Sequence, residues 1–336
     1  MATETTPLKK KDFKSDQDVR WCPGCGDYAI LNSMQTVMAK LGRKKEEVVF
    51  VSGIGCSSRF PYYMDTYGFH TIHGRAPAIA SGVKIANPEL DVWLITGDGD
   101  ALSIGGNHFI HALRRRVNLK ILMFNNRIYG LTKGQYSPTS PIGKVTKTSP
   151  LGSLDTPFNP IHLALASKAS FVARSIDVMG PHLQDVMMQA AKHEGSAFIE
   201  IFQNCNIFND GAFSHLTERD IRDDQLVDLR HGEKLIFGKN KDMAIVMDGF
   251  NPKVVALADV DEADILTWDV DANPAIPYLI AGHEEGKMPT PIGVFRDTKR
   301  DTFEKGVYDQ INAATEKHGV GDLKSLIYAG DLWEVK

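Results

Sequence analysis

Residues 92–100 have the sequence VWLITGDGD, and this stretch decides the fold. Its first part, 92–96, is short, apolar and nearly continuous, which is typical of a strand buried on both faces of a parallel sheet. The segment 97–100 then ends the strand with alternating glycine and aspartate. Further runs of the same kind occur at 48–52, 119–124, 170–174 and 197–202. We therefore expect a sheet with five central strands.

Helical patterns lie between these strands. Apolar residues recur at helical spacing in 28–41, and small or amphipathic stretches follow at 76–86, 107–116 and 182–193. Alternating strands and helices favour right-handed crossovers. The sequence thus predicts an α/β fold with a doubly wound, mostly parallel sheet.

The order along the chain predicts three parts. Residues 1–11 are polar and charged and are expected to form a flexible N-terminal tail, and 12–210 hold the strand and helix alternation. The periodicity weakens after 210, so 211–336 are expected to be a C-terminal extension that packs on the core or on a partner. The loop 130–160 is long for a compact domain, which indicates a functional role.

Composition excludes several classes of protein. The chain has 336 residues and a net charge of −4, which gives no general attraction to nucleic acid or to acidic membranes. It has no signal-peptide pattern and no apolar stretch long enough to span a bilayer, so a cytoplasmic location is expected. Four cysteines are too few for a disulfide scaffold and indicate metal binding or catalysis.

Polar loops follow four of the predicted strands. They are GIGCSSR at 53–59, GDGD at 97–100, NNRIYG at 125–130 and QNC at 203–205. In open α/β sheets the ligand site lies beyond the carboxyl ends of the strands. These loops should therefore converge on one edge of the sheet.

Two of these loops suit a magnesium diphosphate. Mg²⁺ prefers hard oxygen ligands and takes one or two carboxylates together with phosphate oxygens. Asp98 offers a carboxylate, Asn126 an amide oxygen and Ile128 a backbone carbonyl, while Gly97 and Gly99 let the main chain approach phosphates. The alternative is an ordinary exposed turn at Gly-Asp-Gly, which the Asn-Asn pair after the next strand makes less favourable.

The cysteines form a second pattern. Cys22 and Cys25 make a C-x-x-C loop, and Cys56 and Cys205 each follow a predicted strand. Four thiolates from separate loops can hold a cubane iron–sulfur cluster. Structural zinc is the main alternative, but zinc motifs usually bring local pairs of ligands. A redox-active C-x-x-C or buried apolar cysteines are further alternatives that leave part of the set unexplained.

In combination these motifs resemble a known family. WCPGCG at 21–26, GIGCSSR at 53–59, HGRAPAIASGVKIANP at 73–88, GDGDALSIGGNH at 97–108, NNRIYGLTKGQYSPTS at 125–140 and the final NC at 204–205 resemble the β subunit of 2-oxoacid:ferredoxin oxidoreductases. The resemblance covers roughly residues 12–210 and is greatest to the 2-oxoglutarate enzyme, also called 2-oxoglutarate synthase.

The resemblance implies a full set of site residues. It implies that Cys22, Cys25, Cys56 and Cys205 hold a [4Fe-4S] cluster and that Asp98, Asn126 and the Ile128 carbonyl bind Mg²⁺. It implies thiamine diphosphate contacts from Ile54, Gly55, Cys56, Ser57, His73, Gly97, Gly99, Asp100, Gly130 and Leu131, with His73 as the catalytic side chain.

It also implies a reaction and partners. The family oxidatively decarboxylates a 2-oxoacid to its acyl-CoA, with coenzyme A as co-substrate and ferredoxin as electron acceptor. The glutamate that acts on the cofactor's pyrimidine would come from a separate α subunit, because this chain has one domain of the required size. The second carboxylate of 2-oxoglutarate needs a cationic partner, and Arg59 and Lys133 match the family's substrate positions, unless both simply face solvent.

Other functions stay open at this point. A pyruvate-specific or broad 2-oxoacid enzyme would share nearly all of the motifs. A cluster-free thiamine enzyme would be colourless, and a non-catalytic iron–sulfur or zinc module would carry no thiamine diphosphate. Iron content and bound cofactor distinguish these alternatives.

Overall fold

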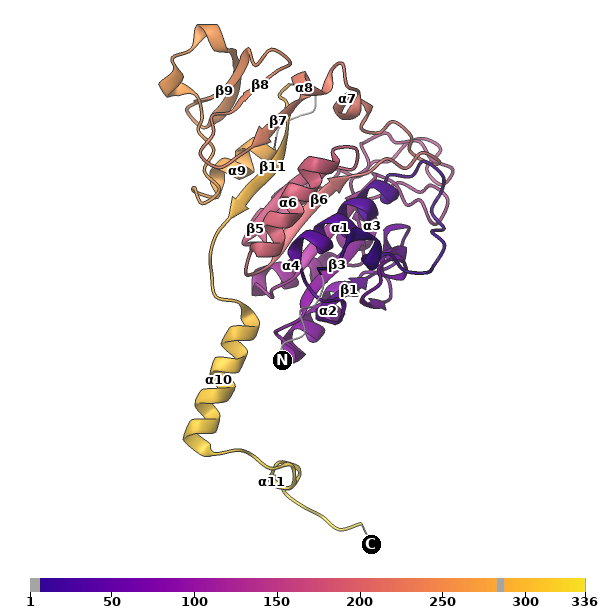
Figure 1. The fold of residues 1–336 in the computed structure, drawn as a ribbon, viewed down its shortest axis with the longest axis vertical. Coiled ribbons are helices and arrows are strands. Elements are labelled where there is room, and N and C mark those ends of the chain that lie inside the picture. Colours follow the sequence, from indigo (N-terminus) through magenta and orange to yellow (C-terminus); the bar gives the residue numbers. More distant parts are fainter. Residues whose placement is uncertain (1–6, 283–286, 336) are drawn as a thin grey trace.

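Figure 1 shows the protein as a computed structural model in which residues 7–282 and 287–335 are described. Its centre is an eight-stranded sheet with the order β2-β1-β3-β4-β6-β5-β11-β7. These strands are β1 (Val48–Ser52), β2 (Tyr67–His70), β3 (Asp91–Gly97), β4 (Lys120–Asn125), β5 (Phe171–Ile176), β6 (Ala197–Phe202), β7 (Leu226–Leu229) and β11 (Thr290–Asp297). All neighbours are parallel except β5 and β11. The predicted mostly parallel α/β sheet is confirmed.

Each of the five predicted runs forms a strand of this sheet. Every residue of β1, β4, β5 and β6 is buried. Neighbouring residues of one strand enter opposite layers: Val49 and Val51 belong to one apolar cluster, and Val48 and Phe50 to the other. Continuous apolar runs are therefore required, because both faces of the sheet are covered.

The helices divide between these two layers. Helices α1 (Asp27–Leu41) and α6 (Gly180–Lys192) pack together on one face. The other face is covered by α2 (Ala76–Ala86), α4 (Gly106–Arg115), α5 (Pro160–Ala166) and α9 (Ala275–Ala281). Helix α1 ends where Gly42 adopts a φ of 66°, a left-handed conformation that favours glycine. A short helix, α3 (Asp98–Leu102), begins directly after β3.

The segment after residue 210 adds to the core sheet and also forms structure of its own. It contributes β7 and β11 to the central sheet. A separate antiparallel sheet has the order β10-β9-β8, formed by β8 (Ile236–Phe237), β9 (Met243–Asp248) and β10 (Asn251–Ala256). Short helices α7 (Ser214–Thr217) and α8 (Arg222–Gln225) precede it. The 3-10 turns of the chain are η1 (Lys10–Phe13), η2 (Lys45–Glu47), η3 (Ser57–Tyr63), η4 (Leu257–Asp259) and η5 (Glu262–Asp264).

The chain ends in an arm that leaves the body of the molecule (Figure 1). It consists of α10 (Phe303–His318), α11 (Leu323–Ile327) and the residues after them. Its large apolar side chains are exposed; Trp333, for example, is 83% exposed. An isolated helix of this length is marginal in water. The arm therefore presents apolar surface that the rest of the described chain does not cover.

The remaining expectations concern the N-terminus and membranes. Residues 1–6 of the expected tail lie outside the described residues, and η1 follows with Phe13 fully buried. Across the part of the chain that the structure describes, no helix is long and apolar enough to cross a membrane.

Candidate active site

The loops after β1, β3 and β4 enclose a cavity of about 100 Å³ at the carboxyl edge of the sheet. All residues predicted to contact thiamine diphosphate or Mg²⁺ line it: Ile54, Gly55, Cys56, Ser57, His73, Gly97, Asp98, Gly99, Asp100, Asn126, Ile128, Gly130 and Leu131. Asp27, Phe124, Tyr129 and Thr132 complete the lining. Residues far apart in the sequence thus meet around one space.

Asp98 is the buried carboxylate of this cavity. It is 2% exposed, and its Oδ2 accepts hydrogen bonds of 2.6 Å from both the Ser137 and the Thr139 hydroxyls. Burial raises the pKa of Asp98, although the two hydroxyls act in the opposite direction. A cation placed beside Asp98 would therefore relieve the cost of burying its charge. Sequence analysis assigned no role to Ser137 and Thr139, although both lie within the quoted motif at 125–140, because single hydroxyls in a polar loop do not by themselves indicate a function.

Asn126 and Ile128 lie on a tight turn after β4. The Asn126 Oδ1 accepts from the backbone N–H of Ile128 at 3.2 Å, and its Nδ2 donates to the Gln203 side chain at 2.8 Å. Arg127, between them, has a φ of 56°, in the left-handed region. These two hydrogen bonds of the Asn126 side-chain amide fix which of its atoms is the oxygen and where that oxygen lies.

Asp100 organises the opposite side of the cavity. Its Oδ1 accepts the backbone N–H of Gly74 at 2.8 Å and that of Ile54 at 3.2 Å, and it also pairs with Nδ1 of His73. Its Oδ2 accepts the Thr96 hydroxyl at 2.7 Å. The Asp100 side chain thus holds loops together, and it orients the half-buried His73 ring so that Nε2 is the nitrogen left for a ligand.

Two glycines leave space that a side chain would fill. A Cβ on Gly99 would lie 2.2 Å from the ring of Tyr129, whose hydroxyl donates to the Gly99 carbonyl at 3.0 Å. A Cβ on Gly130 would point at two sulfur atoms, 3.5 Å from Cys205 Sγ and 3.6 Å from Cys56 Sγ. Gly130 therefore lies at the junction between the cavity and the cysteines.

The four predicted cysteines gather from three loops. The Cys25 N–H donates to the Cys22 carbonyl at 3.0 Å, and the Trp21 indole N–H donates to the Cys56 carbonyl at 2.7 Å, which joins the C-x-x-C loop to the next one. Burial is the main cause that raises the pKa of Cys56 to about 12, and the nearby negative charge of Asp27 is the second cause. Burial also raises the pKa of Cys25. Within residues 7–282 and 287–335, no three Cys, His, Asp or Glu side chains form a group that could hold a single metal ion.

Asp27 is a site residue that sequence analysis missed. It is 1% exposed and lines the cavity beside Cys25. Its Oδ2 has no hydrogen-bond partner among the described residues, and burial raises its pKa to about 7. Its position directly after WCPGCG could have indicated a role beside the cysteines, but an aspartate at the start of a helix is usually a capping residue.

The two predicted substrate residues lie in different settings. Arg59 lines a second cavity of about 560 Å³, which adjoins the first through Ile54, Gly55 and Leu131. Its Nε donates to the Tyr63 hydroxyl at 3.0 Å. Lys133 is exposed, with a φ of 78°, and its side chain lines neither cavity. The structure therefore brings Arg59, but not Lys133, into the wall of either of these two cavities.

Comparisons with known proteins agree with this geometry. Residues 53–201 match the family model described as the thiamine pyrophosphate enzyme C-terminal TPP binding domain. The fold and site thus define the diphosphate-binding domain of a thiamine-dependent enzyme.

Relatives specify the family further. The chain is 51% identical over 337 residues to the 2-oxoglutarate oxidoreductase subunit KorB of Mycobacterium tuberculosis, covering 99% of this chain and 90% of that one. It is 47% identical over 190 residues to the β subunit of 2-oxoacid:ferredoxin oxidoreductase 1 of Aeropyrum pernix, covering 56% and 60%. A solved 2-oxoglutarate:ferredoxin oxidoreductase of Magnetococcus marinus matches with a TM-score of 0.76 at 32% identity, covering 97% of both chains. The chain belongs to the family of 2-oxoacid:ferredoxin oxidoreductase β subunits, as its motifs predicted.

Proposed function

We propose that this chain is the β subunit of a 2-oxoglutarate:ferredoxin oxidoreductase, which converts 2-oxoglutarate and coenzyme A to succinyl-CoA and passes electrons to ferredoxin. One observation carries the proposal: the oxygen ligands suited to Mg²⁺ line one cavity together with Cys56, and Gly130 in the same wall lies beside the sulfurs of Cys56 and Cys205. The Magnetococcus enzyme, which has 2-oxoglutarate, coenzyme A and succinyl-CoA bound, supports the choice of substrate.

The donor set fits Mg²⁺. Asp98, Asn126 and the Ile128 carbonyl would hold the ion, giving one carboxylate and two neutral oxygens and leaving positions for diphosphate oxygens and water. Asp98 already uses Oδ2 for two hydroxyl bonds, which leaves Oδ1 for the cation. The Gln203 bond to Asn126 keeps its amide nitrogen away from the ion.

The residues that line the cavity also suit the cofactor. When bound, thiamine diphosphate supplies the nucleophilic carbon and the electron sink for decarboxylation. Gly97 and Gly99 allow the backbone to approach the diphosphate, since the cavity has no room for a larger residue at 99. His73, held at Nδ1 by Asp100, would offer Nε2 to the bound cofactor or substrate. Ile54 and Leu131 would give the cavity wall apolar side chains.

The cysteines fit a [4Fe-4S] cluster better than zinc. A Zn–S bond of about 2.3 Å places four thiolates roughly 4 Å apart, and such a site would be a tight single-ion group. The described residues form no such group, and a cubane needs wider spacing between its thiolates; Cys56 and Cys205 both approach Gly130 from the side to which a Cβ would point. Cys22, Cys25, Cys56 and Cys205 would hold the cluster, which would take up electrons beside the cavity.

Arg59 is expected to decide substrate preference. Arg59→Ala should lower kcat/KM for 2-oxoglutarate by about ten- to a hundredfold, because a hydrogen bond to a charged group contributes roughly 1.5–3 kcal/mol. The resemblance predicts the same kind of loss for Lys133→Ala, with shorter 2-oxoacids spared, although Lys133 lines neither cavity in the structure. The measurement is a kinetic comparison of 2-oxoglutarate, pyruvate and 2-oxobutyrate.

Tyr63→Phe is the matched control for Arg59. It removes the hydroxyl that accepts hydrogen bonds from the Arg59 Nε and from the Arg20 backbone N–H at 2.9 Å, so it should loosen the Arg59 side chain and cause a smaller loss of the same selectivity. Equal losses on every substrate would assign Arg59 a structural role, and a wild-type preference for pyruvate would end the 2-oxoglutarate assignment.

The α subunit is expected to be required for activity. The chain supplies one thiamine-binding domain, and the glutamate for the cofactor's pyrimidine would lie on the partner. The exposed apolar arm supports the need for a partner surface. Expressed alone, the chain should show no 2-oxoglutarate-dependent dye reduction under anaerobic conditions, and co-expression should restore it. Substantial activity of the single chain would contradict the two-subunit site.

A further inference from the structure

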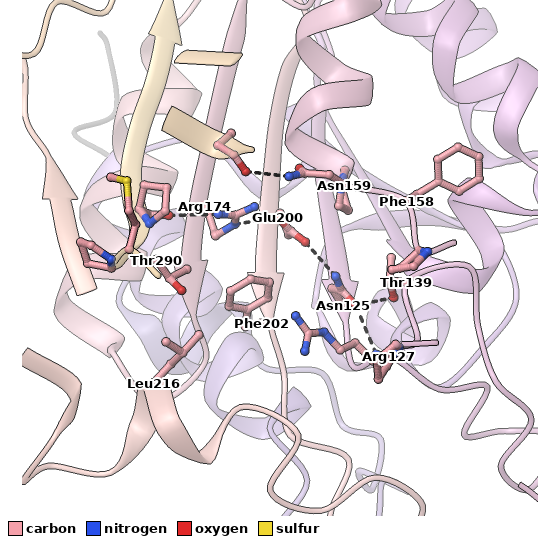
Figure 2. A pocket seen from close by; sticks show the side chains of 17 residues that line it. Asn125, Arg127, Thr139, Phe158, Asn159, Arg174, Glu200, Phe202, Leu216 and Thr290 are labelled. Atoms are coloured by element: carbon pink, nitrogen blue, oxygen red, sulfur yellow. Dashed lines mark hydrogen bonds and ion pairs between the residues drawn. The ribbon is translucent and has the colours of Figure 1, made fainter. Parts of the chain in front are cut away.

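A buried chain of polar side chains leads from the cofactor cavity across the sheet, and Figure 2 shows the part of it from Thr139 through Asn125 and Glu200 to Arg174. It passes from Asp98 to Thr139, Asn125, Glu200 and Arg174 and ends at the Pro291 carbonyl. Its members after Thr139 lie on β4, β6, β5 and β11, which are neighbours in that order. The chain therefore connects Asp98 with a strand of the C-terminal segment.

Thr139 and Asn125, at the start of this chain, contact Asp98 and the turn that carries Asn126 and Ile128. The Thr139 hydroxyl lies 2.6 Å from Asp98 Oδ2 and 2.9 Å from Asn125 Oδ1, and its single proton is shared between these two acceptors, so one side chain contacts both. Asn125 Oδ1 also accepts the backbone N–H of Arg127 at 3.2 Å, which shapes the turn carrying Asn126 and Ile128. The orientation of the Asn125 amide thus affects all three proposed Mg²⁺ ligands.

Glu200 fixes that orientation. Its Oε1 accepts the Asn125 Nδ2 at 2.7 Å, and its Oε2 accepts the Arg174 Nε at 2.7 Å. A carboxylate only accepts, so it forces the amide nitrogen of Asn125 toward itself and the amide oxygen toward Thr139. Arg174 then donates to the Pro291 carbonyl on β11 at 3.1 Å.

The burial of this ion pair points to a positioning role. Glu200 is 1% and Arg174 5% exposed. A buried ion pair is a weak source of stability, since desolvation of both charges offsets their attraction. Arg174 also lies over the rings of Phe202 and Phe295, so its guanidinium is held on several sides. What the pair supplies is a fixed direction for the Asn125 amide.

We propose that Glu200, held by Arg174, is a positioning residue for the Mg²⁺–diphosphate site and acts through Asn125 and Thr139. The proposal rests on the Mg²⁺ site of the proposed function. It adds that β11, outside the region matched by the thiamine-domain model, helps to set the metal ligands. The geometry of the site thus depends on the C-terminal segment as well as on the cofactor domain.

The test measures the Mg²⁺ dependence of cofactor binding in the complex with its α subunit. Thiamine diphosphate binding is followed by calorimetry at increasing Mg²⁺ for wild type, Glu200→Gln and Thr139→Val. Each variant should raise the half-saturating Mg²⁺ concentration by about 10- to 100-fold, as is typical for groups that orient metal ligands. Thr139→Ser should restore the wild-type value, because it keeps the hydroxyl. The two losses should be strongly non-additive when combined.

Ser196→Ala is the matched control. Ser196 is as buried as Glu200, and its hydroxyl donates to the Val117 carbonyl at 3.0 Å. It takes no part in the series of hydrogen bonds from Asp98 to Pro291. It should leave the half-saturating Mg²⁺ unchanged. Variants Thr139→Val and Glu200→Gln that lower the thermal midpoint but keep Mg²⁺ dependence within about twofold of wild type would overturn the positioning role. A wild-type complex that binds the cofactor without Mg²⁺ would overturn the metal site itself, and the inference with it.

Discussion

Asp98→Ala is expected to abolish thiamine diphosphate binding. Asp98 supplies the one carboxylate of the proposed Mg²⁺ site, and its second oxygen is fixed by Ser137 and Thr139. Groups that merely orient a metal ligand cost about 10- to 100-fold in affinity when removed, so loss of the charged ligand itself should exceed that range. Calorimetry of Mg²⁺ and cofactor binding to the assembled complex measures the effect.

Asp98→Asn separates charge from structure. It keeps an oxygen that can accept the two hydroxyl bonds but removes the negative charge. Because burial raises the pKa of Asp98, burying the ionised group is costly, and the unloaded Asp98→Asn protein should unfold at the same or a higher temperature. Asn126→Ala should weaken binding severely and leave the fold intact. Unchanged cofactor affinity in Asp98→Ala would refute the assigned ligand set.

Replacing any one of the four cysteines by serine is expected to remove the proposed [4Fe-4S] cluster. Anaerobically purified wild type should be brown and contain about four iron atoms per chain. Serine at 56 or 205 should have the greatest effect, because these sulfurs lie beside Gly130 at the cofactor cavity. Iron analysis and visible absorbance measure the loss, and 2-oxoglutarate-dependent electron transfer should fall with it.

Ser58→Ala is the matched control for the cysteine variants. It lies in the same loop as Cys56, and its buried hydroxyl has no hydrogen-bond partner within the described part of the chain. It should therefore keep full iron content and stability. A stable, colourless wild-type protein with one zinc ion per chain would contradict the cluster and favour the structural-zinc alternative.

The sequence was sufficient for the central fold because its signals are local. A continuous apolar run specifies a strand buried on both faces, and the five runs occupy the middle of the sheet. Strands β7 and β11 were not predicted, because the apolar pattern is weaker in the C-terminal segment. Asp228 and Thr290 in these strands are only partly buried, and Gly293 has a φ of 94°. The edge strand β2 was hidden for a similar reason, since all four of its residues are exposed.

The sequence by itself determined the cofactor class and most of the cavity lining. Glycine, aspartate, asparagine and cysteine directly after strands are short motifs, and parallel strands bring their carboxyl ends to one edge. Only the tertiary structure decided which groups support them. Thr139 reaches Asp98 across 41 positions, and Arg174 reaches Pro291 across 117. Such pairs leave no period or spacing in the sequence, because strand order in the sheet, and not distance along the chain, makes them neighbours.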